Sequence, residues 1–334
     1  MIKANVSLKA YNTFSIEASA KRFATFTSIL ELRQVLNLRN EESLLVLGGG
    51  SNILLTKDFD GLVIRNQIAG IEIIEETNDY VLIKSGSGIV WHEFVIWCID
   101  HNFGGIENLS LIPGSVGASP MQNIGAYGVE IKDLFEKLEA VNIATGELHE
   151  FNHSDCLFGY RESVFKRKLK DQYIIVSVTF RLTKKHIVNR NYGAINDELE
   201  KQNISTPTIK DISNAIISIR SSKLPDPSKI GNAGSFFKNP VVDNSILERI
   251  QKDYENVPNY PANDKIKLAA GWLIEKAGWK GKTYDNYGVH KNQALVLVNY
   301  SDCTGKDIYD LSSKIIEDVS NKFGLVLERE VNII

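Results

Sequence analysis

The sequence predicts a mixed α+β protein of two or three domains. Short apolar runs typical of strands are interspersed with helical patterns in an irregular order. That order differs from the regular strand–helix–strand repeat of a doubly wound parallel sheet. The chain of 334 residues also exceeds what one hydrophobic core usually supports.

The first part of the chain shows clear element patterns. Alternating apolar residues predict strands at 22–26, within 44–56 on both sides of a glycine run, and at 61–66, with a helix at 28–38. The stretch 71–86 is expected to be a hairpin that turns at Thr77–Asp79, and an apolar-periodic helix should follow near 90–101. Residues 104–128 are glycine-rich and irregular, and a loop of that length with apolar content is typical of a functional segment.

The remaining elements follow the same rules. Strands are predicted at 137–151, with a turn at 144–146, and at 173–182. Thr208 and Asp211 form a Thr-x-x-Asp capping pattern that predicts a helix over 208–223. Further helices are expected at 245–254, 267–277 and 304–323, and further strands at 294–300 and 325–334.

Composition and charge exclude several classes of protein. The net charge of −3 and pI near 6.1 argue against a nucleic-acid binder. Cys98, Cys156 and Cys303 are widely spaced and form no CxxC, which favours a reducing compartment. The sequence shows no signal-peptide pattern and no apolar run long enough to span a bilayer, so we expect a cytoplasmic protein without a membrane partner.

Three apparent motifs do not meet their physical requirements. Gly86–Trp91 begins like a dinucleotide fingerprint, but Trp91 stands where a third glycine should allow close packing. Gly281–Thr283 ends like a P-loop without its first glycine. His149 and His153 lie in a polar run at a strand end, where a solvated surface is favoured, so no metal is expected.

Two glycine-rich stretches are better candidates for a binding site. Backbone N–H groups in Gly48–Asn52 can form an anion-binding nest, although a simple strand connection explains this stretch equally well. The stretch Ile112–Gly128 offers small residues, amides and an aromatic ring, which suit a flat heterocycle and its diphosphate. Together they predict a large nucleotide cofactor held without a Rossmann fold.

Seven segments in order resemble one enzyme family over nearly the whole chain, from Asn12–Phe14 to the last strand. They are GGGSN, IPGSVGASPMQNIGAYG, YRES, KLPDP, GNAGSFFKNP, HKNQALVLVN and LEREV. The chain resembles the UDP-N-acetylenolpyruvoylglucosamine reductases, also called UDP-N-acetylmuramate dehydrogenases, flavoproteins of bacterial peptidoglycan synthesis. Its length and the segment Asn191–Gly193 look like the longer, type I form.

The resemblance implies an FAD-binding fold of the vanillyl-alcohol-oxidase type plus a smaller α+β substrate-binding domain. The expected FAD-binding subdomains are 1–67, joined by the strand 325–334, and 68–221, and the substrate domain is 222–324. NADPH would be the hydride donor. The residues implied for FAD are Gly48, Gly49, Gly50, Ser51, Asn52, Pro113, Gly114, Ser115, Gly117, Ala118, Ser119, Gln122, Asn123, Gly125, Ala126, Tyr127 and Arg220.

The same resemblance implies the chemistry of the site. Ser235 would donate a proton to the carbanion that forms after hydride addition, and Arg161 and Glu330 would polarise the substrate carboxylate. The nucleotide-sugar substrate would be bound by Tyr192, Lys223, Asn239 and Gln293, and we expect a monomer. From the residues alone, loop capping explains Lys223 and Asn239 at least as well, and Tyr192 could be a surface aromatic.

One position departs from the family pattern, and two rival functions stay open. Many members carry arginine where this chain has Asn332, which puts flavin affinity at that edge in question. The first rival is an oxidase of the same flavin fold that uses oxygen on an alcohol or sugar. The second is a nucleotide-sugar-binding protein without activity, which would leave both glycine-rich stretches unexplained.

Overall fold

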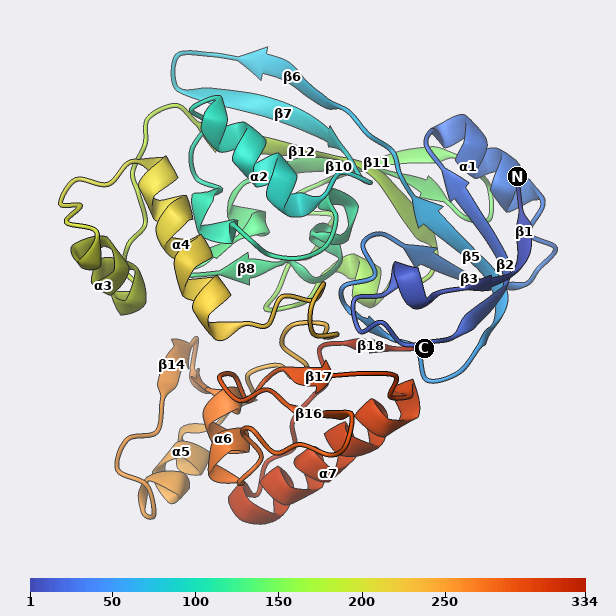
Figure 1. Ribbon diagram of the computed structural model, residues 1–334. Helices are drawn as coiled ribbons and strands as arrows, with labels where there is room; N and C mark the ends of the chain where they lie inside the picture. The colour runs from blue at the N-terminus through green and yellow to red at the C-terminus, as the bar shows by residue number, and fades with distance from the viewer. The chain divides into compact units, whose positions relative to one another are not determined.

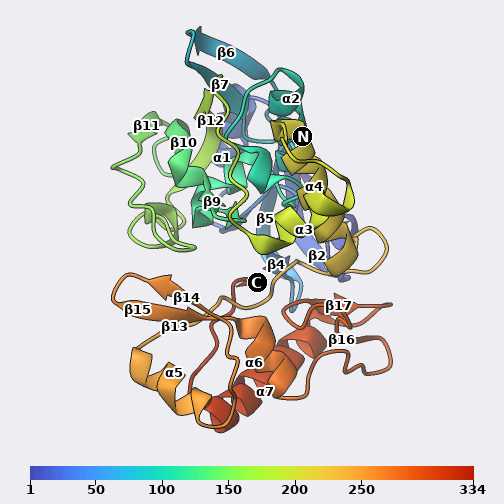
Figure 2. The ribbon, with the colours of Figure 1, turned by 90° about the vertical axis from the view of Figure 1, so that its left-hand side faces the viewer.

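The computed structural model describes the whole chain, residues 1–334 (Figures 1 and 2). The chain forms two compact units. Unit 1 comprises Met1–Val6, Ala20–Gly49 and Asp60–Ser222, and unit 2 comprises Ser7–Ser19, Gly50–Phe59 and Lys223–Ile334. The break after residue 222 falls next to the predicted start of the substrate-binding domain, and the finer division of residues 1–221 stays a prediction.

A four-stranded sheet with one helix forms the first part of unit 1. Its strands, in the order β1-β2-β5-β3, are β1 (Lys3–Ser7), β2 (Ser19–Phe26), β5 (Phe59–Asn66) and β3 (Ser43–Leu47). Helix α1 (Ile29–Asn37) begins after Ser28, whose hydroxyl accepts the N–H of Glu31. Leu32 and Val35 of α1 are buried in the cluster that joins this helix to β2 and β5.

A five-stranded antiparallel sheet carries the main core of unit 1. Its strands, in the order β11-β10-β12-β7-β6, are β11 (Leu148–Asn152), β10 (Phe135–Asn142), β12 (Tyr173–Thr183), β7 (Tyr80–Gly86) and β6 (Ile71–Glu76). Helix α2 (Trp91–Asp100) lies along this sheet (Figure 1). Trp91 and Phe94 are fully buried and pack against Phe180 of β12, with ring centroids 5.7 and 5.1 Å away.

The rest of unit 1 consists of short elements and two helices. The short elements are the hairpin β8 (Gly125–Ala126) and β9 (Val129–Glu130), and the 3-10 helices Glu107–Leu109, Val116–Ala118, Pro120–Gln122, Ile131–Asp133 and Val164–Lys166. Helices α3 (Gly193–Lys201) and α4 (Ile209–Lys223) pack through Ile195, Leu199, Ile212 and Ile216. The predicted cap of α4 is present, because the Thr208 hydroxyl accepts the N–H of Asp211 at 3.3 Å.

Unit 2 combines small sheets with three helices. The strand pairs and sheet are β4 (Ile53–Leu54) with β18 (Asn332–Ile333), β16 (Tyr287–Val289) with β17 (Leu297–Asn299), and β13 (Val241–Val242), β15 (Lys265–Leu268) and β14 (Asn259–Ala262). The helices are α5 (Asn244–Gln251), α6 (Ala270–Lys276) and α7 (Gly305–Phe323), with a further 3-10 turn at Lys9–Tyr11. Figure 2 shows α6 beside α7, and Thr304 and Asp307 form a capping box at the start of α7.

Three predicted elements differ from the structure. The helix expected at 267–277 begins only at Ala270, because Lys265–Leu268 form β15 and pair with β13 and β14. The strands expected at 294–300 and 325–334 shorten to β17 and β18, since their neighbours make isolated bridges instead. Helix α3 and the β14–β15 hairpin were not predicted. None of the helices is both long and apolar enough to cross a membrane.

Candidate functional site

The two glycine-rich stretches contact each other within unit 1. A Cβ on Gly48 would lie 2.3 Å from the Ser115 Oγ, and one on Gly49 would lie 3.4 Å from the Gly114 Cα. Gly114 has φ of +121°, a conformation that side chains disfavour. The absent Cβ of Gly48 therefore leaves room for the Ser115 hydroxyl, and the two loops lie next to each other at Gly49 and Gly114.

The first turn of α2 holds the second glycine-rich loop in place. The Trp91 indole Nε1 donates to the Leu109 carbonyl at 2.9 Å, and the Trp91 backbone N–H donates to the Gly114 carbonyl at 3.0 Å. Trp91, the residue that breaks the dinucleotide fingerprint, is thus buried and holds this loop through two hydrogen bonds. Gly117 lies against the same region, since its Cβ would meet the Ser87 Cβ at 2.5 Å.

Two polar residues assigned to the cofactor are buried inside the loop. The Ser119 hydroxyl donates to the Val116 carbonyl at 2.7 Å. The Asn123 amide donates to the Glu130 carboxylate at 2.9 Å and to the Gly159 carbonyl at 3.0 Å, and its oxygen accepts the Lys132 N–H. These contacts shape the loop, and direct contact of either side chain with the cofactor stays a prediction.

Most of the other residues assigned to the cofactor in this loop are accessible at its surface, whereas Ser115 is buried. Pro113 and Ala118 are exposed and Gln122 is half-buried, while Gly125 and Ala126 form β8. The loop therefore presents small residues and backbone outward while its longer polar side chains fix its shape.

Arg161 is anchored to this loop by its side chain. Its Nη2 donates to the Gly125 carbonyl at 2.8 Å, and its Nη1 lies 3.5 Å from the Asn123 carbonyl. The backbone of Arg161 is left-handed, with φ of +55°, inside a turn closed by two hydrogen bonds between Gly159 and Glu162. A non-glycine residue in that conformation is strained, which is a feature of functional turns.

Arg161 belongs to a cluster of two arginines and two tyrosines in unit 1. Tyr127 packs edge-on to Tyr192, with ring centroids 5.8 Å apart, and it interacts electrostatically with the Arg220 guanidinium. Burial raises the pKa of Tyr127, so the phenol is protonated at neutral pH. The charge of Arg161 acts on Arg220, whose other contact is the Leu111 carbonyl at 3.2 Å from its Nε. The cluster is thus cationic and suits an anion.

Ser235 and Glu330 lie on neighbouring segments of unit 2. The Phe236 N–H donates to the Leu295 carbonyl, and the Phe236 carbonyl accepts the Glu330 N–H, both at 2.8 Å. Ser235 is exposed, whereas Phe236 and Phe237 are buried beneath it, with 0% and 1% of their surface accessible. The hydroxyl therefore stands on a backbone that is clamped on both sides.

Thr13 connects Gly50, the predicted cofactor glycine that lies in unit 2, to the turn before Ser235. The Thr13 N–H donates to the Gly50 carbonyl at 3.1 Å, and the Thr13 carbonyl accepts the Asn232 N–H at 2.9 Å. Gly231 allows this approach, because a Cβ there would lie 2.3 Å from the Phe14 carbonyl oxygen. Thr13 therefore sets the spacing between a predicted cofactor turn and the predicted catalytic turn.

A second connection runs from Asn52 to the C-terminal segment. The Asn52 amide donates to the Glu330 carbonyl at 3.4 Å. Asn332, which replaces the arginine of many family members, donates from its backbone and its side chain to the Asn52 carbonyl, at 3.1 and 2.9 Å. Ser51, the residue before Asn52, is half-buried. Asn332 thus supports the predicted cofactor turn with neutral backbone and side-chain hydrogen bonds rather than with a charge.

The residues predicted to bind substrate divide between the units. Tyr192 is in unit 1 beside Tyr127, and Lys223 is an exposed residue at the end of α4. Asn239 and Gln293 both lie near the start of α6: the Asn239 oxygen accepts the Ala270 N–H at 2.9 Å, and a Cβ on Gly271 would lie 3.0 Å from the Gln293 Oε1. Asn239 therefore has the capping contact that was the alternative to a binding role.

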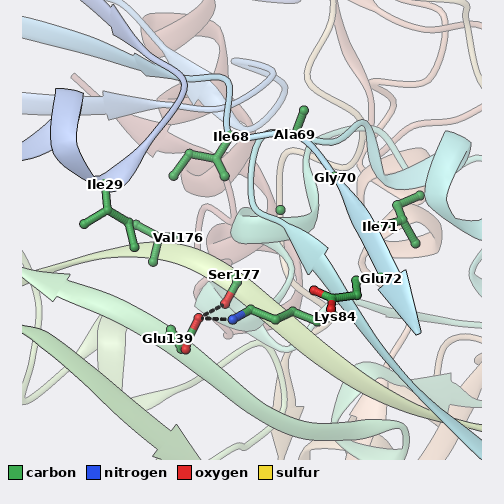
Figure 3. Close-up of a pocket in the computed structure, with 11 residues that line it drawn as sticks. Ile29, Ile68, Ala69, Gly70, Ile71, Glu72, Lys84, Glu139, Val176 and Ser177 are labelled. Carbon is green, nitrogen blue, oxygen red and sulfur yellow. Dashed lines mark hydrogen bonds and ion pairs between the residues drawn. The ribbon is translucent and has the colours of Figure 1, made fainter. Parts of the chain in front are cut away.

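A cavity of about 260 Å³ elsewhere in unit 1 has none of these residues in its lining (Figure 3). Ile29, Ile68 and Val176 line one side of it. On the other side, the Lys84 Nζ lies 2.6 Å from the Glu139 Oε2, and the Ser177 hydroxyl donates to the same oxygen at 2.7 Å. The Lys84, Glu139 and Ser177 groups pair with each other, and the candidate residues of unit 1 and of unit 2 all lie outside this cavity.

Sequence reasoning missed two residues that position the site. Thr13 lies in the segment that marks the start of the resemblance, but it has no pattern that separates it from an ordinary loop threonine. The second is His92, which accepts the Leu111 N–H at 3.0 Å, while the Leu111 carbonyl accepts from Arg220. The only sequence signal for His92 is its position directly after Trp91, the residue that breaks the apparent dinucleotide fingerprint.

The residues present fit the predicted FAD. The loops at Gly48 and Gly114 bring glycine backbone and the Ser115 hydroxyl together, and such groups can donate hydrogen bonds to a diphosphate. The Arg220 Nε donates to the Leu111 carbonyl and the nearby Tyr127 phenol is uncharged, so neither group neutralises the guanidinium charge.

Two family models match the chain. The model described as UDP-N-acetylenolpyruvoylglucosamine reductase, C-terminal domain, matches residues 226–334, and the model described as FAD binding domain matches residues 20–152. The second match covers both Gly48 and Gly114, which supports the FAD assignment of these loops.

Relatives and a solved structure extend the match to full length. Proteins named UDP-N-acetylenolpyruvoylglucosamine reductase from Flavobacterium johnsoniae and Amoebophilus asiaticus are 54% and 50% identical over 100% of this chain and 99% of their own. The protein of that name from Pseudomonas aeruginosa is 46% identical over 99% of this chain and 98% of its own. A crystal structure of the reductase from Thermus caldophilus shares the fold, with a TM-score of 0.71 and 22% identity over 100% of this chain and 98% of that one. The chain therefore belongs to the UDP-N-acetylenolpyruvoylglucosamine reductase family, FAD-dependent oxidoreductases of peptidoglycan precursor synthesis.

Proposed function

We propose that this protein reduces the enolpyruvyl ether of UDP-N-acetylglucosamine to UDP-N-acetylmuramate, with FAD as cofactor and NADPH as electron donor. The observation that carries the proposal is the pair of connections in unit 2. Thr13 joins Gly50 to Asn232, and Asn52 contacts Glu330. They tie the predicted cofactor turn to the segments that hold two of the three predicted catalytic residues, Ser235 and Glu330.

Ser235 is the proposed proton donor. The chemistry that FAD supplies when bound is hydride transfer, from NADPH and then to the terminal vinyl carbon of the substrate. Hydride addition leaves an electron pair on the carbon next to the substrate carboxylate. In our proposal the Ser235 O–H bond breaks as a C–H bond forms at that carbon, and the serine alkoxide then takes a proton from water.

The clamped backbone at Ser235 supports this role. A serine hydroxyl is a weak acid, so it protonates only a strong base held in the correct position. The hydrogen bonds of Phe236 on both sides fix the backbone next to Ser235, and the buried rings of Phe236 and Phe237 hold it from below. Such pre-organisation lowers the cost of aligning donor and acceptor.

Arg161 and Glu330 are proposed to stabilise the negative charge that develops on the substrate carboxylate. Arginine offers a planar pair of donors that matches a carboxylate, and the Gly125 carbonyl fixes the orientation of Arg161. The segment of Glu330 is held by Arg329, which donates to the Ser312 and Ser313 hydroxyls of α7 at 2.8 and 2.7 Å. Glu330 must be protonated to donate to an anion, so its role requires the neutral acid.

The Glu330→Gln variant tests that protonation state. Glutamine keeps a neutral donor at a similar position, so kcat should be retained to within about tenfold, and the alkaline decline of kcat/KM should weaken because no proton is lost there. Steady-state rates across pH measure this, with Glu317→Gln as the control on an exposed glutamate of α7. A pH–rate profile unchanged by Glu330→Gln would contradict the proposed role.

The binding residues complete the proposal. We assign FAD to the two glycine-rich loops with Tyr127 and Arg220, and the nucleotide sugar to Tyr192, Lys223, Asn239 and Gln293. We also propose the type I form of the family, on the segment Asn191–Gly193, and a monomer that acts in the cytoplasm. The buried, unpaired cysteines suit a reducing compartment.

The decisive experiment follows the visible flavin absorption of the purified, FAD-supplied protein without oxygen. NADPH should bleach the flavin bands, and they should return only when UDP-N-acetylglucosamine enolpyruvate is added. Bands that return with oxygen alone would favour the flavin oxidase instead. Absence of flavin bands even with added FAD would contradict the cofactor assignment of both glycine-rich stretches.

A further inference from the structure

Leu111 adopts a strained backbone between two polar side chains of unit 1. Its φ is +57°, in the left-handed region that β-carbon-bearing residues disfavour. Its N–H donates to the His92 Nδ1 at 3.0 Å, and its carbonyl accepts from the Arg220 Nε at 3.2 Å. Such strain persists where the surroundings over-determine the conformation, and these two hydrogen bonds are the contacts that do so on each side of the residue.

The contact with Leu111 defines the chemical state of His92. A backbone N–H can only donate, so the Nδ1 of His92 must carry a lone pair and the ring proton must be on Nε2. The charged groups that act on the ring are Arg220 from α4 and Glu93 from its own helix. Burial, assisted by Arg220, lowers the pKa of His92 below its usual value, while Glu93 acts weakly in the opposite direction. His92 is therefore neutral at pH 7, and the contact is intact.

The position of Arg220 depends on this arrangement. Its Nε donates to the Leu111 carbonyl at 3.2 Å, and the Tyr127 phenol interacts with it electrostatically. If Leu111 relaxed to an ordinary φ, its carbonyl would rotate away and this hydrogen bond would be lost. The guanidinium would then gain rotamer freedom, and an anion would have to bind a less ordered partner.

We propose that His92 is a positioning residue for Arg220, and that it acts through the left-handed Leu111. Unprotonated His92 holds the Leu111 N–H, and the Leu111 carbonyl aims the guanidinium at the anionic group of the cofactor. Protonation of the His92 Nδ1 places its N–H opposite the Leu111 N–H, so this hydrogen bond breaks and the loop is released. The affinity for FAD therefore falls as the pH falls. This inference rests on the proposed function only in assigning Arg220 to FAD.

Two amide substitutions separate the hydrogen bond from the bulk of the side chain. In His92→Asn the Oδ1 takes the place of Nδ1, so the acceptor remains and cannot be protonated. In His92→Gln the amide oxygen is one bond farther from the backbone. An acceptor of equal polarity is therefore moved away from the Leu111 N–H. His101→Asn is the matched control at the C-cap of the same helix, because the His101 ring contacts the Trp97 carbonyl and the rings of Trp97 and Phe103.

The first readout is FAD affinity, measured by flavin fluorescence when apoprotein is titrated between about pH 8 and about pH 5. His92→Gln should weaken binding about tenfold at neutral pH, the loss expected from one hydrogen bond. His92→Asn and His101→Asn should bind as the wild type does at neutral pH. The wild type should lose affinity toward pH 5, whereas His92→Asn should lose much less.

The second readout does not depend on FAD. Nitrogen-15 NMR of labelled histidine distinguishes six side chains, and His92→Asn identifies the resonance of His92. The expected result is an unprotonated Nδ1 that titrates below the usual histidine range. A protonated Nδ1, or equal loss of FAD affinity in the Asn and Gln variants, would overturn the proposal. A wild type that binds no FAD would contradict the proposed function, and the NMR result would then decide the His92 contact alone.

Discussion

The Ser235→Ala variant should lower kcat about 10³-fold, because a positioned proton donor contributes about 10² to 10⁴. The half-reactions should separate. Reduction of the flavin by NADPH does not need this proton, so stopped-flow bleaching should keep its wild-type rate. Reoxidation by the enolpyruvyl substrate should carry the whole loss, since the carbanion then waits for a proton from water.

Two matched variants make this result specific. Ser301→Ala removes an exposed serine of the same unit and should leave both half-reactions unchanged. Ser235→Cys restores an acidic hydrogen at nearly the same place and should recover part of the rate of reoxidation. If the substrate reoxidises the flavin of Ser235→Ala as fast as that of the wild type, Ser235 is not the donor.

The elements that the sequence predicts well are those with a local signal. Helices α4 and α7 begin directly after Thr208 and Thr304, each three residues before an aspartate, and both threonines make capping hydrogen bonds. The hairpin of β6 and β7 was found from alternating apolar residues and its turn at Thr77–Asp79. In these cases the interactions that stabilise the element lie within a few residues of one another.

The site depends on contacts that no local pattern encodes. Asn52 and Glu330 are 278 residues apart in the sequence, and each lies beside a strand of only two residues. A strand of two residues has no readable periodicity. The sequence therefore predicted a longer C-terminal strand at 325–334 but not its pairing with β4. Ser235, Arg161 and Glu330 were assigned through the family resemblance, because their neighbours along the chain do not show which side chains meet.

Gly50→Ala should be the most damaging glycine substitution in the cofactor turn. Gly50 has φ of +61°, and its Cβ would lie 2.0 Å from the Tyr11 carbonyl oxygen and 3.0 Å from the Asn12 Cα. These atoms belong to the backbone and cannot rotate away, so the turn and the Thr13 segment must separate. We expect the free energy of unfolding of unit 2 to fall by roughly 3 kcal/mol, from backbone strain plus overpacking.

The control for Gly50→Ala is Gly278→Ala, which isolates the cost of the conformation. Gly278 is also in unit 2 and also has positive φ, +85°, but nothing lies within 4 Å of its Cβ. That variant should lose only about 1 kcal/mol and should retain FAD. Because the Gly50 carbonyl accepts the Thr13 N–H, Gly50→Ala should weaken FAD binding as well as stability. Urea unfolding and FAD titration measure the two effects, and equal losses in both variants would mean that the approach of Gly50 to Tyr11 does not constrain the turn.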